Sequence, residues 1–175
     1  MDTANLLITG RPGVGKTTLV HSVCRVLERH RPAGFLTREI REGGSRQGFE
    51  LVSLDGRRRT LAHKGMAGQG KVGKYGVDVQ GLEAYLDALH LEAPEAGFIA
   101  IDEIGKMECL SGKFVAMTRQ ALDSERPLLA TVAAKGGGFI TEVKARNDVE
   151  LVLLTEHNRD ALAGEITERL RALLG

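Results

Sequence analysis

The chain has 175 residues, of which 42% are hydrophobic and 27% charged, and its formal net charge is +1. This length predicts one domain over residues 1–175 with a sizeable buried core, and the balanced charge does not indicate nucleic acid or a membrane surface as a partner. The sequence shows no signal-peptide pattern and no apolar run of the roughly 20 residues that a membrane-spanning helix needs.

The first part of the chain predicts a strand, a helix and then a series of extended segments. Residues 5–9 are apolar and predict a buried strand. Residues 15–28 carry hydrophobic side chains at helical spacing. Extended segments are expected at 35–40, 47–54 and 60–63. Because no helix separates these segments, we expect an antiparallel edge or flap there. Residues 64–76 are rich in glycine and lysine and predict a loop.

The second part of the chain alternates helices with strands. The run 98–101 is apolar throughout, as a strand of a parallel sheet covered on both faces requires. The expected elements are helices at 78–90, 111–122 and 158–174 and strands at 98–101, 127–132 and 149–154. This alternation predicts an α/β fold with a mostly parallel central sheet.

Residues 10–17 read Gly-Arg-Pro-Gly-Val-Gly-Lys-Thr and fit the phosphate-binding motif G-x-x-x-x-G-K-[ST], between a predicted strand and a predicted helix. The glycines let backbone N–H groups curl around phosphate oxygens, and the helix directs its positive N-terminal end at the anion. Lys16 is expected to reach the β- and γ-phosphates, and the Thr17 hydroxyl to bind Mg²⁺. The predicted nucleotide contacts in this P-loop are Gly10, Arg11, Pro12, Gly13, Val14, Gly15, Lys16, Thr17 and Thr18.

An acidic pair, Asp102 and Glu103, follows the apolar run 98–101. A P-loop needs a second carboxylate for magnesium at the end of a neighbouring strand, and Asp102 is the candidate, acting through a water molecule. Glu103 is the candidate general base that orients or deprotonates the attacking water. The alternative is that Glu103 is a strand-end carboxylate paired with a lysine.

Several classes of P-loop protein fit these motifs. Residues 102–105 match the D-x-x-G pattern of regulatory GTPases, but no N-K-x-D segment that reads guanine follows. A nucleoside or nucleotide kinase would bind its acceptor phosphate with arginines, for which Arg38, Arg41 and Arg46 are candidates. One of them would alternatively neutralise charge in the transition state, and Arg38 is our catalytic candidate. Each arginine, and the run 57–59, also fits a solvated basic surface.

Hydrolases and kinases treat water differently. A hydrolase must activate water, which suits the carboxylate beside the magnesium ligand. A kinase must exclude water, generally with a lid, and residues 64–76 would supply one. The chemistry of the residues alone leaves both readings open.

Motifs along most of the chain resemble the small nucleoside-triphosphatase family first described in thermophiles, which includes the cancer-related nucleoside-triphosphatase. The matching segments are residues 10–18, 34–41, 46–49, 73–79, 101–108 and 154–160. The segments 73–79 and 101–108 are more specific than the P-loop. The resemblance implies slow, magnesium-dependent hydrolysis of several nucleoside triphosphates to diphosphate and phosphate, with low base selectivity. It also implies a three-layer P-loop fold, RecA-like or nucleotide-kinase-like. The sequence departs from the family pattern at Lys135–Gly138.

Three further residues near these motifs are candidates. Asn158 and Arg159 follow the last predicted strand, where they would contact the base; the alternative for Asn158 is an N-cap of the last helix. Lys106 would sense the γ-phosphate or pair with Glu103. The leading prediction is therefore a cytoplasmic enzyme that hydrolyses ATP, GTP and other nucleoside triphosphates. The alternatives are a kinase with an unidentified acceptor and a nucleotide-dependent switch module.

Overall fold

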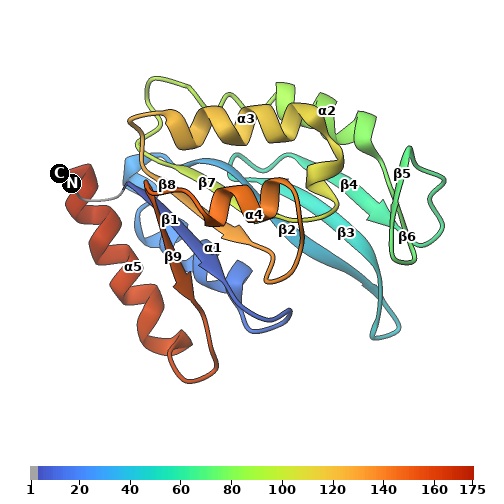
Figure 1. The fold of residues 1–175 in the computed structure, drawn as a ribbon, viewed down its shortest axis with the longest axis horizontal. Coiled ribbons are helices and arrows are strands. Elements are labelled where there is room, and N and C mark those ends of the chain that lie inside the picture. The colour runs from blue at the N-terminus through green and yellow to red at the C-terminus, as the bar shows by residue number, and fades with distance from the viewer. Residues whose placement is uncertain (1–3) are drawn as a thin grey trace.

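The structure is a computed structural model, and it describes residues 4–175. These residues form one nine-stranded sheet with helices on both faces (Figure 1). The strands are β1 Asn5–Thr9, β2 Ala33–Glu42, β3 Ser45–Ser53, β4 Arg58–His63, β5 Gly70–Val72, β6 Tyr75–Val77, β7 Ile99–Ile104, β8 Leu128–Val132 and β9 Val149–Leu153. The helices are α1 Lys16–Val26, α2 Val79–Asp87, α3 Gly112–Asp123, α4 Phe139–Lys144 and α5 Arg159–Leu174, with short 3₁₀ turns η1 Glu28–His30 and η2 Glu108–Leu110.

The sheet has a parallel half and an antiparallel half. Its strand order is β5-β6-β4-β3-β2-β7-β8-β1-β9. Strands β2, β7, β8, β1 and β9 run parallel, whereas β3, β4, β6 and β5 extend the sheet by antiparallel pairing. The expected antiparallel edge is confirmed, and the sheet as a whole is mixed. β2 belongs to both halves, because it pairs with β7 on one side and with β3 on the other.

The three layers enclose two hydrophobic clusters, one on each face of the sheet. Helices α2, α3 and α4 cover one face and contribute residues such as Leu82, Phe114 and Val143. Helices α1 and α5 cover the other face, where Val20 and Ile166 are fully buried. Figure 1 shows α2 and α3 along one side of the sheet and α5 along the other. The three-layer P-loop fold predicted from the sequence is confirmed.

One prediction of local structure is wrong, and one helix is missing from the predicted elements. Residues 64–76 are not a continuous loop, because β5 and β6 form an antiparallel hairpin at the outer edge of the sheet. α4, which follows the glycine-rich Lys135–Gly138 segment, was not predicted. Both β5 and β6 have three residues and α4 has six, too few to show a period of two or of 3.6.

One glycine is required where the two halves of the sheet meet. Gly34 in β2 has a φ of +137°, and a Cβ at this position would lie 1.8 Å from the carbonyl oxygen of Ala100 in β7. Only glycine therefore allows β2 to approach β7 this closely. None of the helices within residues 4–175 combines the length and the apolar character needed to cross a membrane.

Candidate active site

The P-loop connects the carboxyl end of β1 to the start of α1. Gly13 and Gly15 have φ values of +79° and +111°, and nothing lies within 4 Å of a Cβ built on either residue. The backbone therefore turns toward open space, as a phosphate cradle requires. Gly10 instead packs closely, because a Cβ there would lie 2.6 Å from the carbonyl oxygen of Leu154. The loop is thus fixed on one side and open on the other.

The start of α1 is suited to an anion. Gly15 occupies the N-cap position and has no side chain to accept a hydrogen bond from the first turn, which contains no acidic residue. The Nζ of Lys16 donates to the carbonyl oxygens of Gly10 at 3.0 Å and Arg11 at 3.3 Å, so the ammonium group lies over the loop. Uncapped N–H groups at a helix N-terminus attract phosphate. Thr17 and the exposed Thr18 follow in the first turn of this helix.

Asp102 lies on β7, which is not the neighbour of the P-loop strand, because β8 separates β7 from β1. The prediction of a directly neighbouring strand is therefore wrong. Asp102 nevertheless reaches the P-loop: its Oδ2 accepts a hydrogen bond from the Thr17 hydroxyl at 2.6 Å. Its Oδ1 accepts one from the Thr131 hydroxyl of β8 at 2.5 Å. The intervening strand thus supplies a donor that holds the carboxylate in place.

Thr37 of β2 fixes Asp102 from the other side. The backbone N–H of Thr37 donates to Asp102 Oδ2 at 3.2 Å, and its hydroxyl donates to the Asp102 carbonyl oxygen at 2.5 Å. The Asp102–Glu103 peptide bond is cis, and the register of β7 on β8 shifts between Ile101 and Ile104. Asp102 is 2% exposed. This carboxylate is therefore almost fully enclosed by three threonines from α1, β2 and β8.

The predicted magnesium ligands are in contact with each other. Mg²⁺ favours hard oxygen ligands and keeps several waters, so a hydroxyl and one carboxylate beside a phosphate cradle suffice. Thr17 and Asp102 provide this donor set, and the open loop provides the space, so the residues fit the ion. Within residues 4–175 no cluster of three or more His, Cys, Asp or Glu side chains forms an all-protein metal site.

Burial changes the acidity of both members of the acidic pair. Desolvation raises the pKa of Asp102, although hydrogen bonds from Thr131, Thr17 and Thr37 oppose it. Desolvation, followed by the charge of Asp102, also raises the pKa of Glu103. A carboxylate with a raised pKa is a stronger base, which suits proton abstraction from water. No ion pair joins Lys106 to Glu103 in the described part of the chain, and Lys106 is exposed.

The three candidate arginines of β2 and β3 differ in their environments. Arg41 and Arg46 both form ion pairs with Glu39, and Arg46 also lies 5.4 Å from the ring centroid of Phe49. Arg38 is exposed and has no hydrogen-bond or ion-pair partner among residues 4–175. Arg38 and Leu36 share the face of β2 that α1 covers, because side chains alternate along a strand. Arg38 is therefore the arginine left available near the P-loop side of the sheet.

The basic run 57–59 lies elsewhere and is engaged by acidic groups. Arg57 pairs with Asp55, Arg58 with Glu50 and Arg59 with Asp78. These contacts agree with the reading of this run as a solvated surface.

The loop after β9 packs against the P-loop and holds Asn158. The Oδ1 of Asn158 accepts from the Thr155 N–H at 2.8 Å, and its Nδ2 donates to the Leu153 carbonyl oxygen at 2.8 Å. The side chain makes no capping bond to α5. It therefore closes its own loop, so neither of the predicted roles describes its contacts. Arg159 is exposed and lies 3.9 Å from Asp160.

A small cavity lies between this loop and the P-loop. It has a volume of about 320 Å³ and is lined by Arg11, Val14, Leu153, Leu154, Thr155, Glu156 and His157. Arg11 and Glu156 form an exposed ion pair that joins its two walls. Leu153 is 59% exposed and offers apolar surface beside the phosphate cradle.

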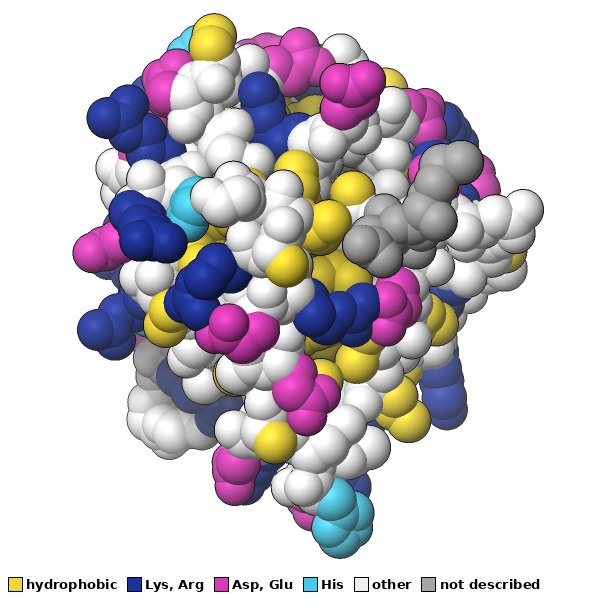
Figure 2. All heavy atoms as spheres, turned by 90° about the vertical axis from the view of Figure 1, so that its left-hand side faces the viewer, with side chains coloured by type: hydrophobic (Ala, Val, Ile, Leu, Met, Phe, Trp, Pro, Cys, Tyr) yellow, Lys and Arg dark blue, Asp and Glu magenta, His cyan; other side chains and the backbone are white. Residues whose placement is uncertain are grey.

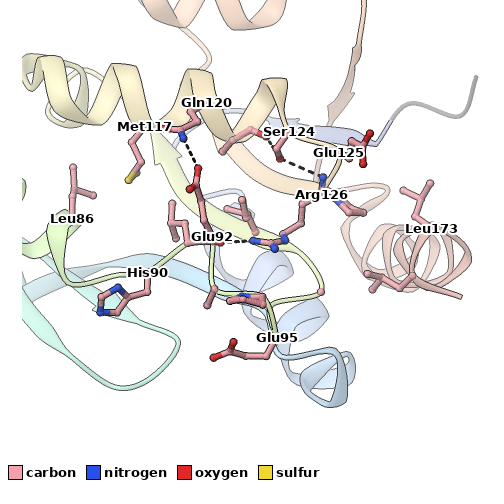
Figure 3. Close-up of a pocket in the computed structure, with 18 of the residues that line it drawn as sticks. Leu86, His90, Glu92, Glu95, Met117, Gln120, Ser124, Glu125, Arg126 and Leu173 are labelled. Atoms are coloured by element: carbon pink, nitrogen blue, oxygen red, sulfur yellow. Dashed lines mark hydrogen bonds between the residues drawn. The ribbon is translucent and has the colours of Figure 1, made fainter.

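A larger groove than this cavity lies at the other end of the sheet. It has a volume of about 1290 Å³ and lies at the amino ends of β7 and β8, between the α2–β7 loop, α3 and the end of α5 (Figure 3). Within it, Arg126 donates to the Leu91 carbonyl oxygen at 2.8 Å and Gln120 donates to Glu92. Figure 2 shows hydrophobic side chains in a hollow among charged ones at this end. The P-loop is at a carboxyl strand end, so this groove is not the phosphate site.

Sequence reasoning missed Thr37, Thr131 and Glu108. The two threonines look like ordinary strand residues, and only the strand order brings them to Asp102. Glu108 belongs to the segment 101–108, but its burial depends on the turn η2.

Comparison with known proteins agrees with this geometry. A family model described as NTPase matches residues 5–167. The chain belongs to this NTPase family. A nucleoside-triphosphatase THEP1 from Thermotoga sp. (strain RQ2) is 42% identical over 167 residues, covering 95% of each chain. One from Natranaerobius thermophilus is 38% identical over 180 residues, covering 99% of this chain and 100% of the relative.

Two solved structures of NTPase family members resemble this fold. The crystal structure of THEP1 from Aquifex aeolicus has a TM-score of 0.84 at 34% identity and covers 95% of this chain and 98% of its own. The solution structure of a human cancer-related nucleoside triphosphatase has a TM-score of 0.80 at 34% identity and covers 96% and 97%. The resemblance to the NTPase family inferred from the motifs is thereby confirmed.

Proposed function

We propose that this chain hydrolyses nucleoside 5'-triphosphates to the diphosphate and phosphate, with Mg²⁺ and with little preference among ATP, GTP, CTP and UTP. The observation that carries the proposal is the contact between Thr17 of the open P-loop and Asp102, directly beside Glu103. The nucleoside-triphosphatase relatives that span nearly the whole chain support it. Its location in the cytoplasm stays a prediction.

Each residue of the site has a distinct task in this reaction. The N–H groups of residues 10–17 and the start of α1 bind the phosphates, and Lys16 exchanges its loop carbonyl partners for the β- and γ-phosphate oxygens. Thr17 and Asp102 would hold Mg²⁺, which when bound would neutralise charge that develops on the phosphate oxygens. Glu103 orients the attacking water and accepts its proton. Arg38, which no acidic group of residues 4–175 engages, would neutralise charge on the transferred phosphoryl group.

Weak base selectivity follows from the loop after β9. Both polar atoms of the Asn158 amide are used within the loop, so they are not available to distinguish one base from another. The neighbouring cavity is lined by Leu153 and by the exposed Arg11–Glu156 ion pair. These side chains offer an apolar and a charged surface, but no fixed set of hydrogen-bond donors and acceptors that matches one base. Apolar and stacking contacts accept every base. A role for Arg159 in stacking stays a prediction.

The test is phosphate release from ATP, GTP, CTP and UTP, with and without Mg²⁺, by wild type, Lys16→Ala and Glu103→Gln. The proposal expects similar turnover of the four substrates, no turnover without Mg²⁺ and a loss of about 10²-fold or more in either variant. Glu125→Gln, an exposed carboxyl in the groove at the far end, is the matched control and should equal wild type.

Three outcomes would contradict parts of the proposal. A strong preference for one base would exclude broad specificity. Full activity in Glu103→Gln would exclude Glu103 as the base. Turnover only after addition of a hydroxyl or phosphate acceptor would identify a kinase instead.

A further inference from the structure

Glu108 is a buried carboxyl group that the proposed reaction leaves without a task. It lies at the start of η2 and is 3% exposed. No lysine, arginine or histidine forms an ion pair with it anywhere in residues 4–175. Buried carboxylates are rarely left without a cationic partner, because desolvation penalises the charge. The buried position of Glu108 therefore favours the neutral form of its carboxyl group.

The carboxyl groups of Glu103 and Glu108 both lie close to Gly105. A Cβ built on Gly105 would lie 2.8 Å from Oε1 of Glu103 and 2.8 Å from Oε2 of Glu108. The two carboxyl groups thus approach the same point, one from β7 and the other from η2. A side chain at residue 105 would push both groups aside, so glycine is needed for their approach.

The two carboxyl groups cannot both be charged at low cost. Like charges that share a buried site raise the pKa of one member of the pair. Burial, and then the charge of Glu103, raise the pKa of Glu108 to about 8, while hydrogen bonds from backbone N–H groups, including that of Gly105, oppose the rise. A neutral carboxylic acid has an O–H group that donates a hydrogen bond, whereas a carboxylate only accepts.

We propose that Glu108 is a positioning residue for Glu103, to which its neutral carboxyl group donates a hydrogen bond that holds the Glu103 carboxylate toward the P-loop. This inference rests on the proposed role of Glu103 as general base. It assigns to η2 a function in orienting the base, in addition to its place in the fold. A purely structural Glu108 would affect stability and nucleotide binding but would not act through Glu103.

Three variants separate these roles, with kcat and KM for ATP measured at pH 7. Glu108→Ala removes the donor and should lower kcat about 10-fold with KM unchanged. Glu108→Gln keeps a donor of similar shape and should restore kcat to within about threefold of wild type. Glu95→Ala, an exposed glutamate at the opposite end of the sheet, is the control and should match wild type.

Gly105→Ala tests the same contact without altering Glu108. The φ of Gly105 lies outside the left-handed region, and the atoms nearest to the added methyl group are the flexible ends of two side chains. The fold should therefore tolerate the substitution while the carboxyl groups move apart. We expect kcat to fall about 10-fold, with little change in KM or in the melting temperature. This variant keeps the inference testable if Glu108→Ala does not fold.

A double-mutant cycle with Glu103→Gln decides between the roles. If Glu108 acts through Glu103, Glu108→Ala and Gly105→Ala cause no further loss of kcat in the Glu103→Gln background. Losses that multiply would overturn the inference, as would wild-type kcat in Glu108→Ala. If Glu103→Gln is inactive but Glu108→Ala is active, the positioning role of Glu108 is refuted while Glu103 remains the proposed base. An active Glu103→Gln instead refutes the proposed base, and the positioning role with it.

Discussion

Replacement of Thr131 by valine tests whether the buried network around Asp102 stabilises the fold. Valine has nearly the shape of threonine but lacks the hydroxyl group that donates to Asp102 Oδ1 at 2.5 Å. Thr131 is fully buried and Asp102 is 2% exposed, so water cannot replace the lost donor. The variant should therefore leave a buried carboxylate oxygen with one partner fewer.

The size of the effect follows from this geometry. A hydrogen bond to a charged group contributes about 1.5–3 kcal/mol, and valine recovers a small part of this as apolar contact. For a chain of this length, 1 kcal/mol lowers the melting temperature by about 2–4 °C. We expect Thr131→Val to unfold about 3–8 °C below wild type, in thermal unfolding followed by circular dichroism without nucleotide or magnesium.

Thr118 of α3 supplies the matched control. It is also fully buried, but its hydroxyl group has no hydrogen-bond partner within residues 4–175. Thr118→Val removes an unsatisfied polar group and should leave the melting temperature unchanged or raise it. Equal melting temperatures for the two variants would refute the reasoning, because the loss at Thr131 would then not come from its bond to Asp102.

Three other changes test separate features. Gly34→Ala should lower the free energy of unfolding, measured with urea, by at least about 3 kcal/mol. The reason is that the added Cβ would lie 1.8 Å from the Ala100 carbonyl oxygen at a φ of +137°. An unchanged urea midpoint would contradict this. Asp78→Ala removes the N-cap of α2 and should lower the free energy of unfolding by about 1 kcal/mol at pH 7. The hydrogen bond from Arg59 lowers the pKa of Asp78. The loss of stability in Asp78→Ala should therefore become smaller as the pH falls through this lowered pKa. A loss of stability that does not change with pH would contradict this. Burial raises the pKa of Glu108 from 4.5 to about 8. As the pH rises, Glu108 therefore ionises at a lower pH in the unfolded chain than in the folded protein. Wild type should therefore lose stability relative to Glu108→Gln between those pH values, and parallel pH profiles would exclude this.

The sequence predicts the parts of the site that depend on local pattern. The P-loop is a contiguous motif between a strand and a helix, and both boundaries of β1 agree with the structure. The apolar run before Asp102 likewise identifies β7, because a buried parallel strand must be apolar throughout. These features need no knowledge of which strands pair.

The parts that depend on strand order could not be predicted. β8 lies between β1 and β7, although it follows both in the chain, and this order alone brings Thr131 to Asp102. Asn158 follows the last strand as expected, but its amide binds its own loop, a choice that residue type does not determine. The hairpin of β5 and β6 is held by pairing with β4 rather than by its own periodicity.

β2 gives the protein a direct mechanical link between its two halves. One continuous strand runs from the contact with β7 at Ala33–Phe35, through Thr37, to the β2–β3 hairpin. Its first residues, Ala33–Phe35, pair with β7, and its residues from Phe35 onward pair with β3, so the same strand is hydrogen-bonded first to one half of the sheet and then to the other. Thr37, whose backbone N–H binds the Asp102 carboxylate, thus lies on the strand that leads into the β2–β3 hairpin. One continuous strand therefore joins the antiparallel half to the carboxylate that we propose as a magnesium ligand.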